Sequence, residues 1–169
     1  MSLLTARSDW RARGRVGLTA VVGMLVVVAT LLVSRPAGAQ GDVHVFLPAA
    51  SLTHKFFDFG REGLRLGDRL VGRGPLLDGS QAEEVGFLSQ DCVVVRTISD
   101  APDGPGGVYR CSYLLRLAEG DLIVEGLDPH GPGAYTMAVL GGTAAYSRAT
   151  GDATLTDNDE GTDFVINLT

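Results

Sequence analysis

Two acidic residues, Asp58 and Glu125, stand beside apolar neighbours and are the first candidates for proton chemistry. Asp58 follows two phenylalanines, and Glu125 lies between Ile123 and Leu127 on one face of a predicted strand. A carboxyl group inside an apolar cavity has a raised pKa because burial penalises its charged form, so it can donate or accept a proton. We predict both as candidate catalytic residues, Asp58 chiefly because of the motif in which it stands. If either side chain faces solvent instead, it is an ordinary surface acid.

Three tyrosines are candidates for the wall of a ligand pocket. Tyr109 and Tyr113 share one face of a predicted strand, where they would offer flat apolar surface and hydroxyl donors. Core packing explains this pair equally well. Tyr146 is the bulky apolar residue of a glycine-rich turn within 141–153 and is the third candidate.

The first 39 residues resemble an export signal. Four arginines precede an uncharged, mainly apolar run at 16–33, and the small residues 37–39 resemble a signal-peptidase cleavage site. We predict a secreted or extracytoplasmic protein with a signal peptide at 1–39, an N-terminal extension at 40–53 and one domain at 54–169. The alternative is an uncleaved membrane anchor, because the apolar run is near the shortest length that spans a bilayer.

Cys92 and Cys111 both lie in the part that would be exported, and an oxidising compartment favours a disulfide between them. The turn between the two flanking strands is centred near residue 103. Directly opposed cysteines would need a centre between 101 and 102, so a bulge or a diagonal contact must reconcile the two. Two buried free thiols are the alternative.

Charge and spacing exclude several classes of function. Loss of the signal segment removes five Arg and one Asp, which leaves 9 basic and 19 acidic residues and a net charge of −10. This balance predicts no nucleic-acid partner. The three histidines are too far apart for a metal-binding motif, and no phosphate-binding glycine loop occurs, so we expect no metal and no cofactor.

The part after residue 40 reads as all-β, because short β-branched and aromatic runs alternate with Gly, Asp and Pro. Eight strands are predicted, at 54–59, 69–77, 85–98 (with a break at 89–91), 108–118, 121–128, 135–140, 149–157 and 163–168. The segment 40–53 adds an edge strand or lies across a barrel end. Short turns make consecutive strands antiparallel, and both a sandwich and a closed barrel fit the pattern.

Four motifs resemble the allene oxide cyclase and dirigent β-barrel superfamily. They are Phe56-Phe57-Asp58, Gly67-Asp68-Arg69-Leu70-Val71, Val85-Gly86 with Cys92-Val93-Val94-Val95, and Gly141-Gly142-Thr143 with Tyr146, Ala149 and Gly151. The resemblance implies an eight-stranded antiparallel barrel with a mainly apolar cavity. It also places Asp58 at the position of a cavity acid of dirigent proteins, which is the chief reason to predict this residue as catalytic, and implies a homo-oligomer, a trimer or a dimer.

The resemblance further implies an isomerase or cyclase that acts on a small hydrophobic molecule, oxylipin-like or polyketide-like, by holding a reactive conformer. The region 72–75 lacks the Asn of plant cyclases, and Ser147 and Thr150 stand near positions where plant dirigents carry arginines. The plant reactions are therefore not expected here. A non-catalytic, lipocalin-like carrier or a dirigent-like auxiliary protein is the alternative function.

Overall fold

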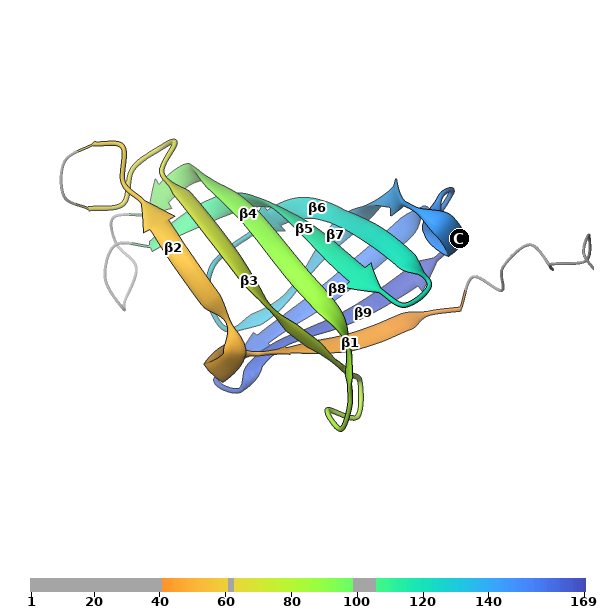
Figure 1. Ribbon diagram of the computed structural model, residues 1–169. Helices are drawn as coiled ribbons and strands as arrows, with labels where there is room; N and C mark the ends of the chain where they lie inside the picture. The colour runs from red at the N-terminus through yellow and green to blue at the C-terminus, as the bar shows by residue number, and fades with distance from the viewer. Residues whose placement is uncertain (1–40, 61–62, 99–105) are drawn as a thin grey trace, which may run out of the picture. The chain divides into compact units, whose positions relative to one another are not determined.

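The computed structural model describes residues 41–60, 63–98 and 106–169, and the predicted signal segment lies outside them. Within the described part the chain forms nine strands and two short 3-10 helices (Figure 1). In chain order these elements are β1 (Val43–Pro48), η1 (Ala49–Ser51), β2 (Thr53–Phe57), β3 (Arg69–Asp78), β4 (Glu84–Ile98), β5 (Gly106–Leu117), β6 (Gly120–Asp128), β7 (Gly133–Gly142), η2 (Ala144–Tyr146), β8 (Gly151–Asn158) and β9 (Gly161–Leu168).

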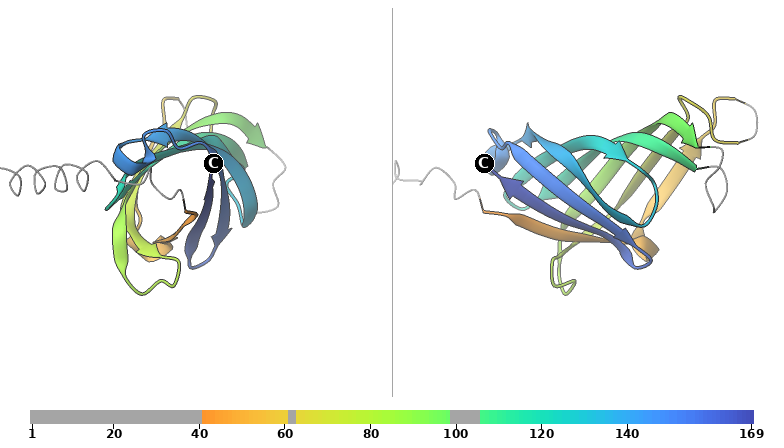
Figure 2. Two further views of the ribbon diagram at one scale, coloured as in Figure 1. Left: turned by 90° about the vertical axis from the view of Figure 1, so that its right-hand side faces the viewer. Right: turned by 180° about the vertical axis from the view of Figure 1, so that it is seen from behind.

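The strands form one antiparallel sheet that closes on itself. From β3 to β9 each strand pairs with the next in sequence, and β1 pairs with β9 along its whole length. Closure occurs where Val45 and Phe46 of β1 pair with Asp78 and Leu77 of β3. Seen from one end, the ring of strands is evident (Figure 2). The eight strands β1 and β3 to β9 thus make a closed antiparallel barrel, which confirms the predicted architecture. The predicted first strand at 54–59 corresponds to β2 and is not one of the eight, and β1, within the predicted extension 40–53, takes its place.

β2 is an additional strand at the mouth of this barrel. It pairs with the first half of β3, from Arg69 to Arg73, whereas β1 pairs with the last residues of β3. The 3-10 turn η1 separates β1 from β2 and redirects the chain. All five residues of β2 are exposed, so this strand rises beside an open end of the barrel.

Side-chain alternation explains why these segments become barrel strands. On β5 the inward residues Tyr109, Cys111, Tyr113 and Leu115 are buried, whereas Arg110 and Arg116 face outward and are exposed. One half of the interior is filled by large apolar side chains with no exposed surface: Leu76, Leu88, Leu115, Leu122, Leu155, Phe164 and Ile166. Each such burial stabilises the fold by about 1.5–3 kcal/mol.

The predicted strands match the observed ones within a few residues, with two differences. β4 runs without the predicted break at 89–91, because those residues pair continuously with both β3 and β5. The segment 43–48, which was left open as an edge strand or an end cover, is β1 and pairs on both sides. This short segment contains few residues that could indicate its pairing. Its partners on β9 lie far away in sequence.

The disulfide joins Cys92 of β4 to Cys111 of β5, as predicted. The two residues are directly paired, and a register shift between Val94 and Arg96 inserts the extra residue that the turn length required. The bulge rather than a diagonal contact therefore reconciles the cysteine positions with the centre of the turn. Both sulfur-bearing side chains are 1% exposed.

The glycine-rich stretch 141–153 turns the chain from β7 into β8 at the packed end. A Cβ atom at Gly142 would lie 2.0 Å from the carbonyl oxygen of Asp121, so the two backbones could not approach. Gly151 has a φ of +138° and would meet the carbonyl oxygen of Asn167 at 1.9 Å. Tyr146 of η2 is buried between these turns and joins the core. This stretch therefore closes one end of the barrel.

Across residues 41–60, 63–98 and 106–169, no helix has the length and apolar character needed to cross a membrane.

Candidate functional site

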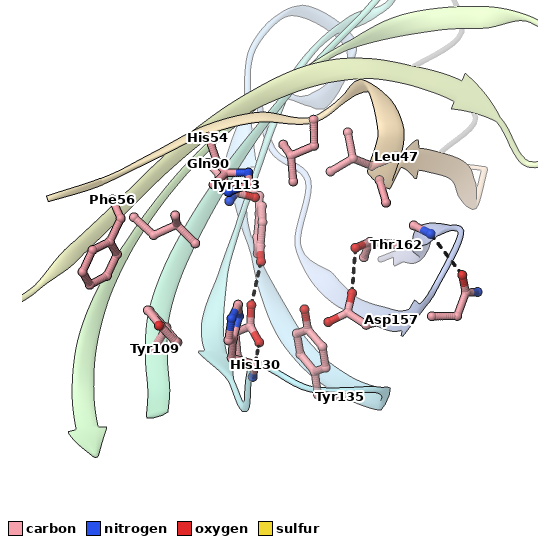
Figure 3. A pocket seen from close by; sticks show the side chains of 16 residues that line it. Leu47, His54, Phe56, Gln90, Tyr109, Tyr113, His130, Tyr135, Asp157 and Thr162 are labelled. Carbon is pink, nitrogen blue, oxygen red and sulfur yellow. Dashed lines mark hydrogen bonds between the residues drawn. The ribbon is translucent and has the colours of Figure 1, made fainter. Parts of the chain in front are cut away.

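A cavity of about 390 Å³ opens at the end of the barrel opposite η2 (Figure 3). Its volume falls within the usual range of small-molecule sites. Many lining residues come from the ends of β1, β6 and β8 and from β5, β7 and β9, and the others come from η1, β2, β3 and β4. The ends of β1, β6 and β8 and the starts of β5, β7 and β9 meet at the same end of an antiparallel barrel. Phe164 has no exposed surface and contacts the Tyr113 ring edge-on, with centroids 5.6 Å apart, so it belongs to the packed layer beneath the cavity.

The inward residues change character toward this mouth. Along β6 the buried Leu122 and Val124 are followed, at the same two-residue period, by Asp128. Along β8 the buried Ala153 and Leu155 are followed by Asp157. The alternation that builds the core therefore also turns two carboxyl groups into the cavity.

Asp128 is the more deeply buried of these acids, with 7% of its surface exposed. Its Oδ2 accepts a hydrogen bond of 3.1 Å from the Tyr113 hydroxyl, and its Oδ1 accepts one of 2.6 Å from the backbone N–H of His130. Cys111 Sγ of the disulfide lies 3.7 Å from Oδ2. The buried Asp128 carboxyl group is thus held in place by two hydrogen-bond donors.

Asp157 lies beside Tyr135 on the cavity wall (Figure 3). Its Oδ1 accepts a hydrogen bond of 2.6 Å from the Thr162 hydroxyl. Burial raises the pKa of Asp157 above its usual value, and the nearby charge of Asp128 acts in the same direction, while the Thr162 hydrogen bond opposes the shift. Asp157 therefore binds a proton more readily than a surface aspartate does.

The tyrosine hydroxyls of the cavity remain protonated. Burial is the main cause that raises the pKa of Tyr113, with the charge of Asp128 second. Burial likewise raises the pKa of Tyr135, whose hydroxyl interacts with Tyr113. The cavity thus presents neutral phenol donors next to two carboxyl groups, an arrangement that can bind and reprotonate a polar atom of a ligand.

Aromatic and amide side chains complete the wall. The rings of Tyr109 and His130 lie 4.8 Å apart at an angle of 55°, and Phe56 and His54 face the cavity from β2. Gln90 projects from β4 over Gly72, where a Cβ atom would come within 2.8 Å of its amide nitrogen. The glycine in β3 therefore leaves the space that this amide occupies.

Asp68, just before β3, holds described residues of the connection from β2 in place. This residue is 1% exposed, and its carboxylate accepts hydrogen bonds from the backbone N–H groups of Phe59 (3.1 Å) and Arg65 (2.7 Å). Gly67 has a φ of +91°, and its N–H bonds the Val94 carbonyl. The Gly-Asp pair before β3 thus ties the β2–β3 connection to β4.

The structure brings only part of the predicted site together. Tyr109 and Tyr113 line the cavity, whereas Tyr146 belongs to the core at the other end. Asp58 is exposed and accepts a hydrogen bond of 2.7 Å from the Gly60 N–H. Glu125 faces outward between the exposed Ile123 and Leu127, with Arg110 3.9 Å away. Neither acid lines the cavity, so the premise of a desolvated carboxyl group is not met at these two positions.

Sequence reasoning missed Asp128, Asp157 and Tyr135. Each ends or begins a strand next to a turn, where an acid or a tyrosine usually indicates an exposed position. The signal that could have found them is phase: each continues the two-residue period of the buried side chains of its strand. In the described ranges, no group of three or more His, Cys, Asp and Glu residues is placed to hold a metal ion.

Comparison with known proteins relates this chain to others through its fold. Neither a protein-family model nor a curated protein matches the sequence. Among solved structures, pyocyanin demethylase matches with a TM-score of 0.61 at 22% identity, over 76% of this chain and 100% of that one. The Diels–Alderase AbmU from Streptomyces koyangensis matches with a TM-score of 0.57 at 14% identity, over 89% of this chain and 70% of that one. The pterocarpan synthase dirigent protein GePTS1 matches with a TM-score of 0.52 at 14% identity, over 75% of this chain and 83% of that one.

These matches confirm the predicted fold. The chain is an eight-stranded antiparallel barrel, and its fold is similar to that of the Diels–Alderase AbmU and of the dirigent protein GePTS1. At identities of 22% or less the likeness concerns the fold, so the chemistry must be argued from the cavity itself.

Proposed function

We propose that this protein is an isomerase or cyclase that binds a small, flat, mainly apolar molecule at the barrel mouth and moves a proton within it. The observation that carries the proposal is the convergence of Asp128, Asp157, Tyr113 and Tyr135 on one cavity. Solid packing beneath them gives the cavity a rigid floor. A ligand held against that floor would be limited to few conformers, which lowers the entropic cost of reaction.

In this proposal Asp157 is the proton-transferring group. Its carboxylate takes a proton from the bound molecule and returns it at another atom of the same molecule, so that no net proton is consumed. A raised pKa suits this role, because the group then exchanges protons closer to neutral pH. The Tyr113 hydroxyl donates its single proton to Asp128, so toward the ligand it offers its oxygen as a hydrogen-bond acceptor.

The non-catalytic carrier is the second candidate. A purely apolar pocket would favour a carrier, whereas this wall contains two carboxyl groups, which a reaction that moves a proton can use. The names of the fold relatives, a demethylase and a Diels–Alderase among them, are also those of enzymes acting on small organic molecules. Both points favour the enzyme.

We also propose that the protein works outside the cytoplasm. The disulfide and the signal-like segment 1–39 support this, because structural disulfides persist in oxidising compartments. The homo-oligomer stays a prediction, and size-exclusion chromatography with light scattering would test it.

Native mass spectrometry of the protein purified from its own host tests the proposed function, by detecting a small molecule that copurifies. A matched pair of variants locates that molecule. Ala49→Trp would fill the cavity wall and should release it, whereas Ala138→Trp, on an exposed outer position of β7, should retain it. Absence of any bound molecule, together with no thermal shift in a panel of apolar compounds, would reject the site.

A further inference from the structure

The charge of the cavity narrows the class of molecule that it can hold. Its wall contains two aspartates, and among the described residues that line it there is no Lys or Arg. Outside the cavity, Arg69 pairs with Asp91, and Arg110 and Arg116 lie near Glu125 and Asp121 on the outer surface. The barrel therefore places basic partners beside several outer acids, whereas the described lining of the cavity supplies no Lys or Arg for its two acids.

The hydrogen bonds inside the cavity do not neutralise these acids. Tyr113, Thr162 and the His130 N–H are uncharged donors, so they orient the carboxylates without cancelling their charge. The two histidines of the wall, His54 and His130, are both exposed at the mouth. Negative potential in a cleft with low-dielectric walls is focused toward its interior.

The remaining wall is aromatic. Phe56, Tyr109, Tyr113 and Tyr135 surround the acids, and aromatic faces attract cations through the negative face of the ring. The chain as a whole has a net charge of −6, which attracts cations over a longer range.

We propose that the ligand is a planar heteroaromatic molecule that carries a positive charge, such as a protonated or N-alkylated ring nitrogen. This inference rests on the proposed function and specifies its substrate class. The charged nitrogen lies between Asp128 and Asp157, and the ring system stacks against the tyrosines. An oxylipin, whose carboxylate would meet two like charges in a partly desolvated site, is a poor fit to this cavity.

Three probes of nearly the same shape test the inference. They are 1-methylquinolinium, which is a cation, 1-methylnaphthalene, which is neutral, and 1-naphthoate, which is an anion. Isothermal titration calorimetry or fluorescence titration at neutral pH gives each dissociation constant for the wild-type protein. We expect the cation to bind about tenfold or more tightly than the neutral ring, and the anion to bind most weakly.

Two variants on β8 assign the preference to the cavity. Asp157→Asn keeps the shape of the side chain and the acceptor for Thr162, and should reduce the cation-to-neutral affinity ratio about tenfold. Asp152→Asn removes the same charge from the exposed face of the same strand, where it accepts a hydrogen bond from Asn167, and should leave the ratio unchanged. Using a ratio cancels the different hydration of the probes, and circular dichroism confirms that both variants fold.

The outcomes separate this inference from the proposed function. Tight binding of the neutral ring with no preference for the cation, or a ratio unchanged in Asp157→Asn, would overturn the substrate class and leave the cavity as a binding site. Preference for the anion would overturn it as well. If none of the three probes bound, the cavity itself would be rejected, and the proposed function with it.

Discussion

Tyr113 donates a 3.1 Å hydrogen bond to Asp128, although Asp128 lies four positions beyond Val124, the residue paired with Tyr113 on β6. The long side chain of Tyr113 on β5 thus reaches diagonally along the inner face to the carboxyl group at the end of the neighbouring strand β6. This diagonal contact separates the packed half of the barrel from the cavity. It links the core, through Phe164 beneath the Tyr113 ring, to the acid that the site depends on.

Tyr113→Phe removes the donor and leaves one oxygen of a buried carboxylate without this partner. We expect the free energy of unfolding to fall by about 1–3 kcal/mol. Tyr109→Phe is the matched control, since it deletes the same atom on the same face of β5 and should cost less. Urea unfolding of both variants measures the difference. Equal losses would show that the Asp128 contact contributes nothing particular.

The raised pKa of Asp157 predicts a pH dependence of stability. Because the folded state holds the Asp157 proton more tightly than the unfolded state, the stabilising effect is complete below the unfolded pKa of about 3.9 and is lost as pH rises through the raised folded pKa. Asn cannot ionise, so Asp157→Asn should gain stability relative to the wild type across that window. Urea unfolding at a series of pH values tests this. A loss of stability in Asp157→Asn relative to the wild type across that window would contradict the burial of this acid.

Asp68→Ala removes the acceptor of two backbone N–H groups in a position that is 1% exposed. We expect a loss of about 1–3 kcal/mol in unfolding free energy and faster amide exchange at Phe59 and Arg65. Asp78→Ala is a control at the other end of β3, where the carboxylate also caps a turn but is more exposed to solvent. It should cost less, and an equal cost would argue against a special role of Asp68.

The Cys92–Cys111 disulfide closes a loop with a sequence separation of 19. For a loop of this size the constraint on the unfolded chain is worth about 3 kcal/mol, so Cys92→Ser with Cys111→Ser should lower the unfolding free energy by about that amount. Intact mass after alkylation, with and without prior reduction, checks the bond itself. Two alkylated thiols in the unreduced protein would contradict it.

Much of the barrel could be predicted because strand formation follows local patterns. The alternation on β5 and the turns between consecutive strands depend on neighbouring residues. The spacing of the two cysteines required either a bulge or a diagonal contact, and the structure has the bulge. The role of β1 could not be predicted, since its pairing with β9 joins residues more than a hundred positions apart. Local propensity carries no information about that contact.

The site was predicted less well than the fold. Tyr109 and Tyr113 were found because they share one face of a predicted strand and combine apolar rings with hydroxyl groups. Asp58 was chosen by resemblance, but it directly follows β2, an exposed strand outside the closed barrel, and its side chain is exposed. Glu125 was chosen by apolar neighbours, but Ile123 and Leu127 are themselves on the outer face. An apolar neighbour two residues away indicates the same face without telling which face is inside.

Turnover by Asp157→Asn and Asp58→Asn tests the central claim most directly, with the molecule that copurifies with the protein as substrate. If the barrel mouth performs the reaction, Asp157→Asn should lower kcat by roughly 10²–10⁴ while the substrate still binds, and Asp58→Asn should stay within about twofold of the wild type. Unchanged turnover in Asp157→Asn, or a large loss in Asp58→Asn alone, would contradict the proposed site.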